Sequence, residues 1–480
     1  MEIKADGYPF SGKTPIQPEK EHPMRKNLLD QLPLTPAEID HRHAQELATI
    51  STLLDEMPEA TAAVHEDLSW RGKKRVDPSK GRKGMAAEQV LRAAILKQMT
   101  GFSYDQLAFH LADSNTYRSF VRLGYASEPP KKSTLQKNVK RVRAETLQRV
   151  NQQVVLKAQE LGFEAGDKMR TDCTVIESNI HHPTDSSLLW DCVRVFTRTM
   201  GKAKEDFGVQ FTNHSRRAKK RSMNISNAKS FQQRKPVYRE LIKLTEKTIK
   251  QAERVVEDLQ HVVPHSLMQA ARLSSLIAEL NHYVGLTNQV VSQAERRVLR
   301  GESVPASEKI VSIFEPHTDI IIKDNRETEY GHKICLSTGP SGLVTDLVVE
   351  EGNPADANLA VRMVERANSL FGKVPRQVSF DGGFASRANL AAIKALGVED
   401  AAFNKRCGLE ITEMAKSKSV YRALSAFRSG IEGSISFLKR SFGLARCMWR
   451  GFASFKAYAQ ASALACNLLI LARHVLANTT

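Results

Sequence analysis

The sequence predicts a mixed α/β protein in which helices flank a mixed sheet, with an all-α N-terminal domain and a large α-helical insertion. Three observations predict this class. Strand-like alternation of apolar and polar residues begins only after residue 166. Helical apolar spacing fills the chain before that point, and a second long helical stretch separates the first strand from the next two. At 480 residues, with 41% hydrophobic residues, the chain can bury a large core and should form several domains.

The first 83 residues predict an arm, a helix and a basic linker. Residues 1–35 are polar and contain scattered prolines, and Thr35-Pro36 opens a helical pattern that continues to Leu54. Between Arg71 and Lys83 there are seven basic residues and one acid, with glycine and proline interspersed. This composition is typical of a charged connecting loop.

Residues 84–165 predict a compact helical DNA-binding domain. One helix covers residues 86–99, and a capping box of Ser103 with Gln106 opens a second. A further capping box, Ser133 with Gln136, predicts one long helix to about Leu161. Two helices and a tight turn followed by a basic helix resemble a helix-turn-helix unit, although a bundle with a solvated basic face fits equally well. The candidate DNA contacts here are Lys137, Lys140, Arg141 and Arg143.

Residues 166–185 and 311–480 predict one sheet domain. In the segment 168–176, alternation places Met169 and Cys173 on one face and Arg170 and Asp172 on the other. Gly339-Pro340-Ser341-Gly342 joins two further strands as a hairpin. The remaining expected elements are a helix at 355–370, a strand at 377–380, a helix at 386–396, a strand at 401–404, and helices at 425–442 and 452–476.

Residues 186–310 predict a helical hairpin or small bundle inserted between the first strand and the hairpin. Pro264 separates two long amphipathic arms. Between His214 and Lys235 there are eight Lys or Arg residues and no acid, which favours contact with a polyanion. The candidate DNA contacts in this block are Arg216, Arg217, Lys219, Lys220 and Arg221.

The overall charge indicates a nucleic-acid partner. The net charge is +17 and the pI is about 9.5, so a polyanion is the expected ligand. The six cysteines have neither C-x-x-C spacing nor a paired histidine motif, which argues against a zinc site or a disulfide framework. We expect a cytoplasmic, nucleoid-associated protein, because the N-terminus has no apolar export segment. The longest apolar run is interrupted by Ser462 and Asn467, so we expect no membrane span.

Three acids occupy positions that suit metal chemistry. Asp172 lies in the first strand, Asp381 ends a later strand, and Glu432 lies on a helix after the last strand. Carboxylate oxygens prefer hard cations, and two such ions can hold both oxygens of a phosphoryl displacement. On a helical wheel Arg428 and Lys439 lie about 40° and about 20° from Glu432, so two cations share its stripe.

These residues resemble the DDE transposases of bacterial insertion sequences that carry a Tyr-x2-Arg-x3-Glu-x6-Lys signature. The segment SAFRSGIEGSISFLKR supplies Arg428, Glu432 and Lys439 at that spacing, while Ser425 stands at the tyrosine position and Tyr421 lies one turn away. The segments TDCTVIESNIHHPTDSSLLWD and VSFDGGF resemble the surroundings of the first and second acids. The likeness covers most of residues 84–475.

The resemblance implies a ribonuclease-H-like catalytic domain and a transposition reaction. Asp172, Asp381 and Glu432 would form a DDE triad that holds two Mg²⁺ or Mn²⁺ ions, and Arg428 and Lys439 would contact DNA phosphates. The enzyme would bind terminal inverted repeats, free a 3′-OH at each end and join it to target DNA. It would act as a homodimer or a larger assembly on paired ends.

Other interpretations of the chain remain open from sequence. The whole protein could be a relative that only binds DNA, or a metal-dependent nuclease without strand transfer. His181-His182 fits a loop pair better than a metal site, because no spaced acid or cysteine accompanies it. Trp190 and Trp449 could stack on unpaired bases but are more typical of a core.

Overall fold

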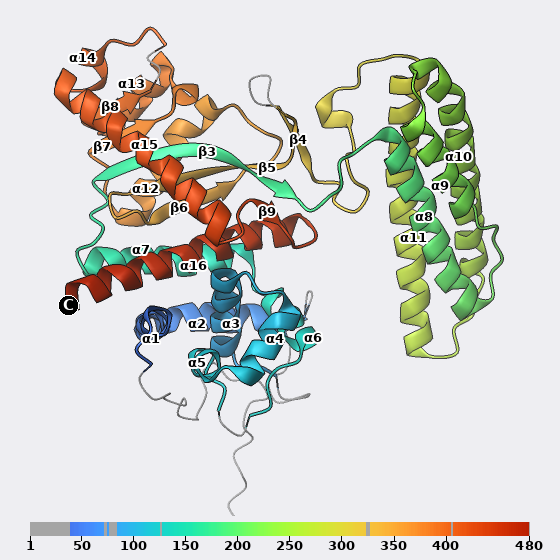
Figure 1. Cartoon of the computed structure of the whole chain (residues 1–480), viewed down its shortest axis with the longest axis horizontal. Coiled ribbons are helices and arrows are strands. Elements are labelled where there is room, and N and C mark those ends of the chain that lie inside the picture. Colours follow the sequence, from blue (N-terminus) through green and yellow to red (C-terminus); the bar gives the residue numbers. More distant parts are fainter. Residues whose placement is uncertain are drawn as a thin grey trace, which may run out of the picture.

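A computed structural model describes residues 39–71, 74–75, 84–124, 127–322, 327–404 and 407–479. It contains an N-terminal group of helices, a sheet with helices on both faces, and a long helical bundle that stands to one side of the sheet (Figure 1). This arrangement confirms the predicted mixed α/β class. The predicted arm at 1–35 and most of the predicted basic linker lie outside the described residues.

Seven helices form the N-terminal part and its connection to the sheet. Their bounds are α1 Arg42–Asp55, α2 Pro58–Leu68, α3 Ala87–Thr100, α4 Tyr104–Asp113, α5 Asn115–Phe120, α6 Lys132–Val139 and α7 Ala144–Glu160. Within the predicted linker, β1 (Trp70–Arg71) pairs with β2 (Lys74–Arg75) as a short antiparallel ribbon. The predicted capping box is confirmed, since Gln106 N–H donates to Ser103 Oγ and Ser103 N–H donates to Gln106 Oε1.

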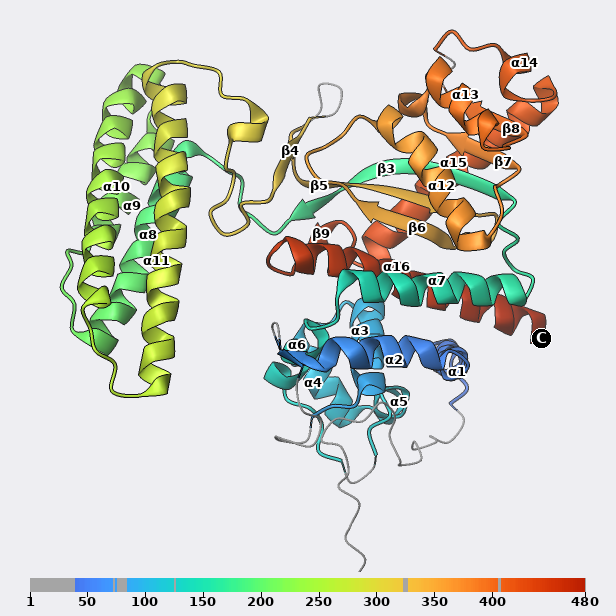
Figure 2. The same ribbon diagram turned by 180° about the vertical axis from the view of Figure 1, so that it is seen from behind.

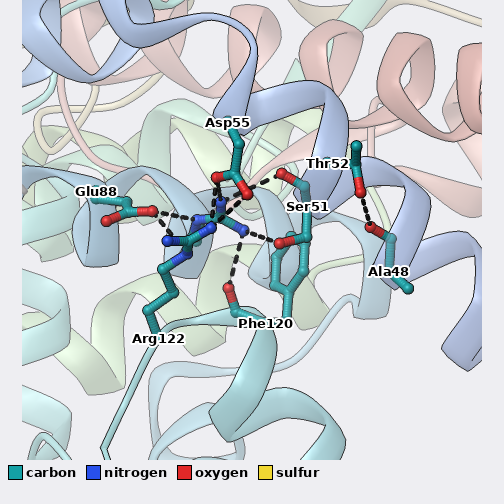
Figure 3. A network of polar contacts seen from close by, with 8 residues as sticks. Ala48, Ser51, Thr52, Asp55, Glu88, Phe120 and Arg122 are labelled. Carbon is teal, nitrogen blue, oxygen red and sulfur yellow. Dashed lines mark hydrogen bonds and ion pairs between the residues drawn. The ribbon is translucent and has the colours of Figure 1, made fainter. Parts of the chain in front are cut away.

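A network of polar contacts joins the first helices, and in it Asp55, Glu88 and Arg122 point toward one another (Figure 3). Arg92 is 1% exposed and pairs with Asp55 at 2.6 Å and Glu88 at 3.1 Å, and Arg122 binds the same two carboxylates. Burial lowers the pKa of Arg92, and the positive charge of Arg122 lowers it further, while the two acids oppose that shift. The network links α1, α3 and the end of α5, so it fixes the packing of this domain.

The prediction of one long helix from Ser133 is wrong. The chain forms α6, breaks at residues 140–143, and starts again as α7. The break has a tertiary cause. The backbone N–H of Arg143 donates to Asp67 Oδ2 at 2.8 Å, and the Arg141 guanidinium donates to the carbonyl oxygens of Leu68 and Trp70. These contacts with the end of α2 hold Arg143 in an extended conformation that a continuous helix would not allow.

The sheet has the strand order β6-β5-β3-β7-β8. Here β5 is antiparallel to its neighbours, whereas β7 and β8 run parallel to β3. This order and these directions fit the ribonuclease-H-like sheet that the resemblance implied. Two unpredicted short strands, β4 and β9, pair with β5 and β3. The bounds are β3 Lys168–Ser178, β4 Asp319–Ile321, β5 Glu329–Thr338, β6 Val344–Val349, β7 Gln377–Phe380, β8 Asp400–Phe403 and β9 Arg446–Cys447.

Helices cover both faces of the sheet, and residue alternation decides which side chains meet them. Met169 and Cys173 pack in one core with α12 and α13, whereas Ile176 packs in another with α15 and α16. The predicted alternation of β3 is therefore confirmed. In the two opposite views α7 and α16 run side by side between the sheet and the N-terminal helices (Figures 1 and 2). The bounds are α12 Ala360–Phe371, α13 Arg387–Ala395, α14 Ile411–Met414, α15 Lys418–Ser441 and α16 Phe452–Thr479.

The insertion is a bundle of long helices with its own apolar core. Its two ends are held together, because Gln293 exchanges hydrogen bonds with the backbone of Ile310 and also donates to Asp185. Asp185 is buried and pairs with Arg297, while the neighbouring Thr184 side chain caps the first helix. The bounds are α8 Asp185–Phe207, α9 Ser215–Asn227, α10 Phe231–Gln260 and α11 Leu267–Ala294, which a π-helical turn extends to Leu299.

Helix α16 is long and apolar enough to cross a membrane, but 72% of its most apolar window is buried inside the protein. Its polar residues are used internally. Asn467 is fully buried, accepts from Val344 N–H at 2.8 Å and donates to Val344 O at 2.7 Å and to Asn151 at 2.9 Å. Asn467 therefore joins α16 to strand β6 and to helix α7, which accounts for this segment as a core helix.

We predict that Asn467→Ala lowers the free energy of unfolding by about 2–4 kcal/mol, because it removes the side-chain partner of the buried Val344 N–H and of Asn151 Oδ1 and leaves the Val344 carbonyl with the 3.4 Å hydrogen bond from Asn151. Denaturant unfolding followed by circular dichroism measures the change. Asn478→Ala, at the exposed end of the same helix, should stay within about 0.5 kcal/mol of the parent. Equal losses in the two variants would contradict the proposed link.

Candidate active site

Two of the predicted acids lie side by side on neighbouring strands. Thr171 of β3 is in register with Phe380, the last residue of β7. One step further along both parallel strands come Asp172 and Asp381. The central strand and the end of its parallel neighbour therefore place two carboxylates at the same level of the sheet.

The third acid reaches them through an arginine. Glu432 and Arg428 are one turn apart on α15, which packs on this face of the sheet (Figure 1). The Arg428 guanidinium binds all three carboxylates. Its nitrogens lie 2.8 Å from Asp172 Oδ2, 3.3 Å from Asp381 Oδ1 and 2.7 Å from Glu432 Oε1. Sequence reasoning placed Arg428 beside Glu432 but missed that it joins the whole triad.

Exposure increases from the arginine outwards. The Arg428 side chain is 9% exposed and that of Asp172 is 14%, whereas Asp381 is 41% and Glu432 is 66% exposed. The cluster is therefore an acidic group with a buried cation at its centre and two carboxylates open to solvent. Arg428 Nε is buried and has no acceptor within the described residues, so this side chain has further capacity to donate.

The donor set suits a divalent cation, although the acids are not arranged around one here. Among the described residues, no three acid, histidine or cysteine side chains are gathered closely enough to hold a metal ion. A guanidinium already occupies the centre of the cluster, where it supplies positive charge to three carboxylates. Oxygen-only ligands that converge on one cation are the type that Mg²⁺ and Mn²⁺ prefer. The residues present therefore fit such an ion once Arg428 moves aside.

Another arginine holds α15 against the central strand. Arg170 lies on the same face of β3 as Asp172, donates from Nε to Thr338 Oγ1 at 2.7 Å and from Nη1 to the Phe427 carbonyl at 2.9 Å. Burial lowers the pKa of Arg170, and nearby Glu164 opposes that shift. Gly430 makes the close approach possible, since a Cβ at this position would lie 2.0 Å from Arg170 Nη1. Sequence reasoning missed this role, and the glycine within an amphipathic helix was the available signal.

The tyrosine position of the signature is occupied differently. Ser425 Oγ is buried and has no hydrogen-bond partner within the described residues. Tyr421 donates its hydroxyl to the Phe403 carbonyl at the end of β8, at 2.8 Å. Tyr421 therefore ties α15 to the sheet edge. Lys439 lies two turns beyond Glu432 on the same helix and is half-buried.

The predicted DNA contacts of the N-terminal part divide into two pairs. Arg141 and Arg143 are engaged with the end of α2, and a hydrogen bond from Arg143 to Asp67 raises the pKa of that arginine. Lys137 and Lys140 are exposed at the end of α6. None of the four lies in the acidic cluster. Their roles toward DNA stay predictions.

The predicted contacts on the bundle form an exposed stripe of α9, away from the triad. Arg216, Arg217, Lys219 and Lys220 face solvent, and Arg221 is half-buried and pairs with Glu240 at 3.0 Å. His181 lies 3.5 Å from Asp191, and the His182 ring meets the edge of Tyr330. Trp190 is half-buried beneath Arg194, and Trp449 is buried.

We predict that Gly430→Ala is less stable than Gly433→Ala by about 1–2 kcal/mol. Alanine at 430 displaces the Arg170 guanidinium from Phe427 and Thr338, whereas nothing lies within 4 Å of a Cβ at 433. Alanine at 433 should itself stabilise the helix by up to about 1 kcal/mol. Thermal unfolding of both variants measures the difference. Equal stabilisation by the two alanines would contradict the role of Gly430.

Comparisons with known families match two parts of the chain. The transposase DDE domain matches residues 310–468, and the transposase domain DUF772 matches residues 37–141. No curated protein and no solved structure matches significantly. The DDE match starts after the bundle, so it omits β3 and Asp172, which the structure places in the centre of the same sheet. The chain therefore carries an N-terminal transposase domain at residues 37–141 and, at residues 310–468, a DDE domain of the kind that catalyses DNA transposition.

Proposed function

We propose that this transposase binds the terminal inverted repeats of its element, hydrolyses the phosphodiester at each end to free a 3′-OH, and joins that hydroxyl to target DNA. The observation that carries the proposal is the convergence of Asp172, Asp381 and Glu432 on one guanidinium. Three acids from three separate parts of the chain share one cation, in a protein that carries a transposase DDE domain.

DDE enzymes use divalent metals, and we propose that two Mg²⁺ or Mn²⁺ ions bind at this triad. Asp172, Asp381 and Glu432 are the residues that would hold the ions. Such ions supply positive charge at the attacking and leaving oxygens of the phosphoryl group. The open positions of Asp381 and Glu432 support this assignment, since an ion can reach them from solvent.

Arg428 has a separate part in the proposal. Without metal it neutralises the acids, which would otherwise repel one another at close range. When the acids take up metal, the guanidinium is free to bind a phosphate of the DNA end, which it matches as a two-pronged donor. Lys439 lies on the same helix stripe, where a phosphate on that face would meet it.

We propose that the remaining DNA contacts come from the basic parts of the two helical regions. The exposed stripe of α9, from Arg216 to Lys220, has the charge density of a phosphate-binding surface. Lys137 and Lys140 are exposed at the corner of α6. We further propose that the enzyme works as a homodimer or a larger assembly in the cytoplasm, because two ends must be processed together.

We predict that Asp381→Asn binds DNA like the parent but joins a pre-nicked end to plasmid DNA about a thousandfold more slowly, because a neutral amide weakens the hold on the metals. A strand-transfer assay with Mg²⁺ or Mn²⁺ measures joining. Glu399→Gln, an exposed carboxylate at the sheet edge, should join normally. Strand transfer by Asp381→Asn at the parent rate would contradict the catalytic role of the triad. A parent enzyme that cleaves DNA but never joins it to plasmid would be a nuclease instead.

We predict that Arg428→Ala binds Mn²⁺ about tenfold or more tightly, because removing a unit charge at this distance changes the electrostatic free energy by about 1–4 kcal/mol. In EDTA the same variant should unfold at a lower temperature than the parent, since its carboxylates have lost the guanidinium that binds all three of them. Titration calorimetry and thermal scans measure both effects. Arg422→Ala, exposed on the same helix, is the control, and unchanged affinity in Arg428→Ala would count against competition for the acids.

A further inference from the structure

A cavity of about 540 Å³ lies where the bundle joins the sheet. Its walls come from the chain just after β3, from α8, from the segment that returns out of the bundle, and from the link between β9 and α16. It is separate from the acidic triad and from the basic stripe of α9. Four distant parts of the chain must therefore fold together to form it.

The cavity is lined by cationic side chains. Arg194 and Arg198 come from consecutive turns of α8, and Arg450 comes from the β9–α16 link. His181 comes from the chain just after β3. Arg198 and Arg450 are exposed and form no ion pair with any described residue. The indole N–H of Trp449 in the same wall is buried without an acceptor in the described part of the chain. The wall thus offers several donors that have no acceptor.

The acids near the cavity are already engaged. Asp191 is 1% exposed and binds Arg194 at 2.6 Å and His181 at 3.5 Å, so it holds these two side chains in position. Glu315 accepts hydrogen bonds from His317 and from Gly451 N–H. Burial alone would raise the pKa of Glu315, but those bonds and the charges of His317 and Arg450 outweigh it and lower the pKa. The remaining charge of the cavity is positive.

Aromatic rings fix the direction of one of these cations. The Arg194 guanidinium lies 4.9 Å from the centre of the Trp190 ring and 5.6 Å from the centre of the Phe314 ring. A guanidinium held by two rings and a buried carboxylate loses little further freedom when it binds an anion. The site is therefore partly organised before any ligand arrives.

The position of the cavity relative to the triad suits DNA. The cavity begins at Asn179, directly after the end of β3 and seven residues after Asp172, so this edge of the cavity lies up to about 23 Å from Asp172 at 3.3 Å per residue. Phosphates of one DNA strand advance about 3.4 Å along the duplex axis per residue. A duplex that lies along β3 with its end at Asp172 would therefore reach the cavity about seven base pairs further inside, where either strand can present the phosphate.

We propose that this junction cavity binds a backbone phosphate of the duplex whose end is processed at the triad. The inference rests on the proposed function for the identity of the duplex, while the anion site itself rests on Arg194, Arg198 and Arg450. Phosphate contact is independent of base sequence, so the cavity positions the DNA and does not select its sequence.

The test compares salt dependence of DNA binding in two double variants. Arg198→Gln with Arg450→Gln removes both unpaired arginines of the cavity. Lys373→Gln with Arg376→Gln removes the same charge from exposed side chains near the opposite end of the strand, where they pair with Asp167 and Glu399. The probe is a short duplex of arbitrary sequence, and the dissociation constant is measured over a range of KCl concentrations without divalent metal.

The cavity variant should bind with a slope of log K against log salt that is less steep by about 0.9, because the cavity holds one phosphate and each phosphate contact contributes about 0.9. The control variant should keep the parent slope, and both should unfold at the parent temperature. An unchanged slope in the cavity variant, or an equal loss in the control, would overturn the proposal. Failure of the proposed strand-transfer function gives a different result. In that case the parent protein binds DNA with the full salt dependence but joins no DNA end to plasmid.

Discussion

Three carboxylates do not stay close together in a folded chain without a compensating positive charge, and one guanidinium supplies it here. Arg428 lies within 3.3 Å of Asp172, Asp381 and Glu432, so it joins the central strand, the neighbouring strand end and helix α15. Removing one charged partner from such a cluster destabilises the folded protein, because the remaining charges are left uncompensated. The arginine therefore has two effects at once, because it stabilises the packing of α15 on the sheet and it keeps the acids in reach of one another. A divalent ion could take over both.

The second constraint is the continuity of the central strand. Strand β3 is paired with β5 on one side and with β7 on the other, and the bundle leaves the sheet only after the strand has ended. Because Gln293 holds Ile310 and Asp185 together, the bundle enters and leaves through closely spaced ends. A long insertion closed in this way adds little entropic cost to the fold and does not disturb pairing. This explains how the acids stay in register although the first is far from the others in sequence.

The elements that local patterns specify were predictable, and those that tertiary contacts specify were not. The hairpin around Gly339 and the capping box at Ser103 follow from turn and cap chemistry within a few residues. The break at Arg143 depends on Asp67, a residue far along the chain, and no local pattern announces it. The same holds at the site. Spacing placed the acid and its arginine on one stripe, but only the packing of α15 shows that the arginine also reaches both aspartates.

Strand β3 links the chemistry to the surrounding surface. One face of it carries Arg170, which fixes α15, and Asp172, which belongs to the triad, while its far end opens into the junction cavity. A rigid strand that is paired on both sides keeps such groups at fixed separations. DNA phosphates are also regularly spaced, so a linear array of protein groups can match a linear array of charges without reading any base. The excess of positive charge in the chain can bind DNA phosphates where the cations are held at a fixed distance from the acids. The bundle contributes such cations to the junction cavity, which lies beyond the end of strand β3.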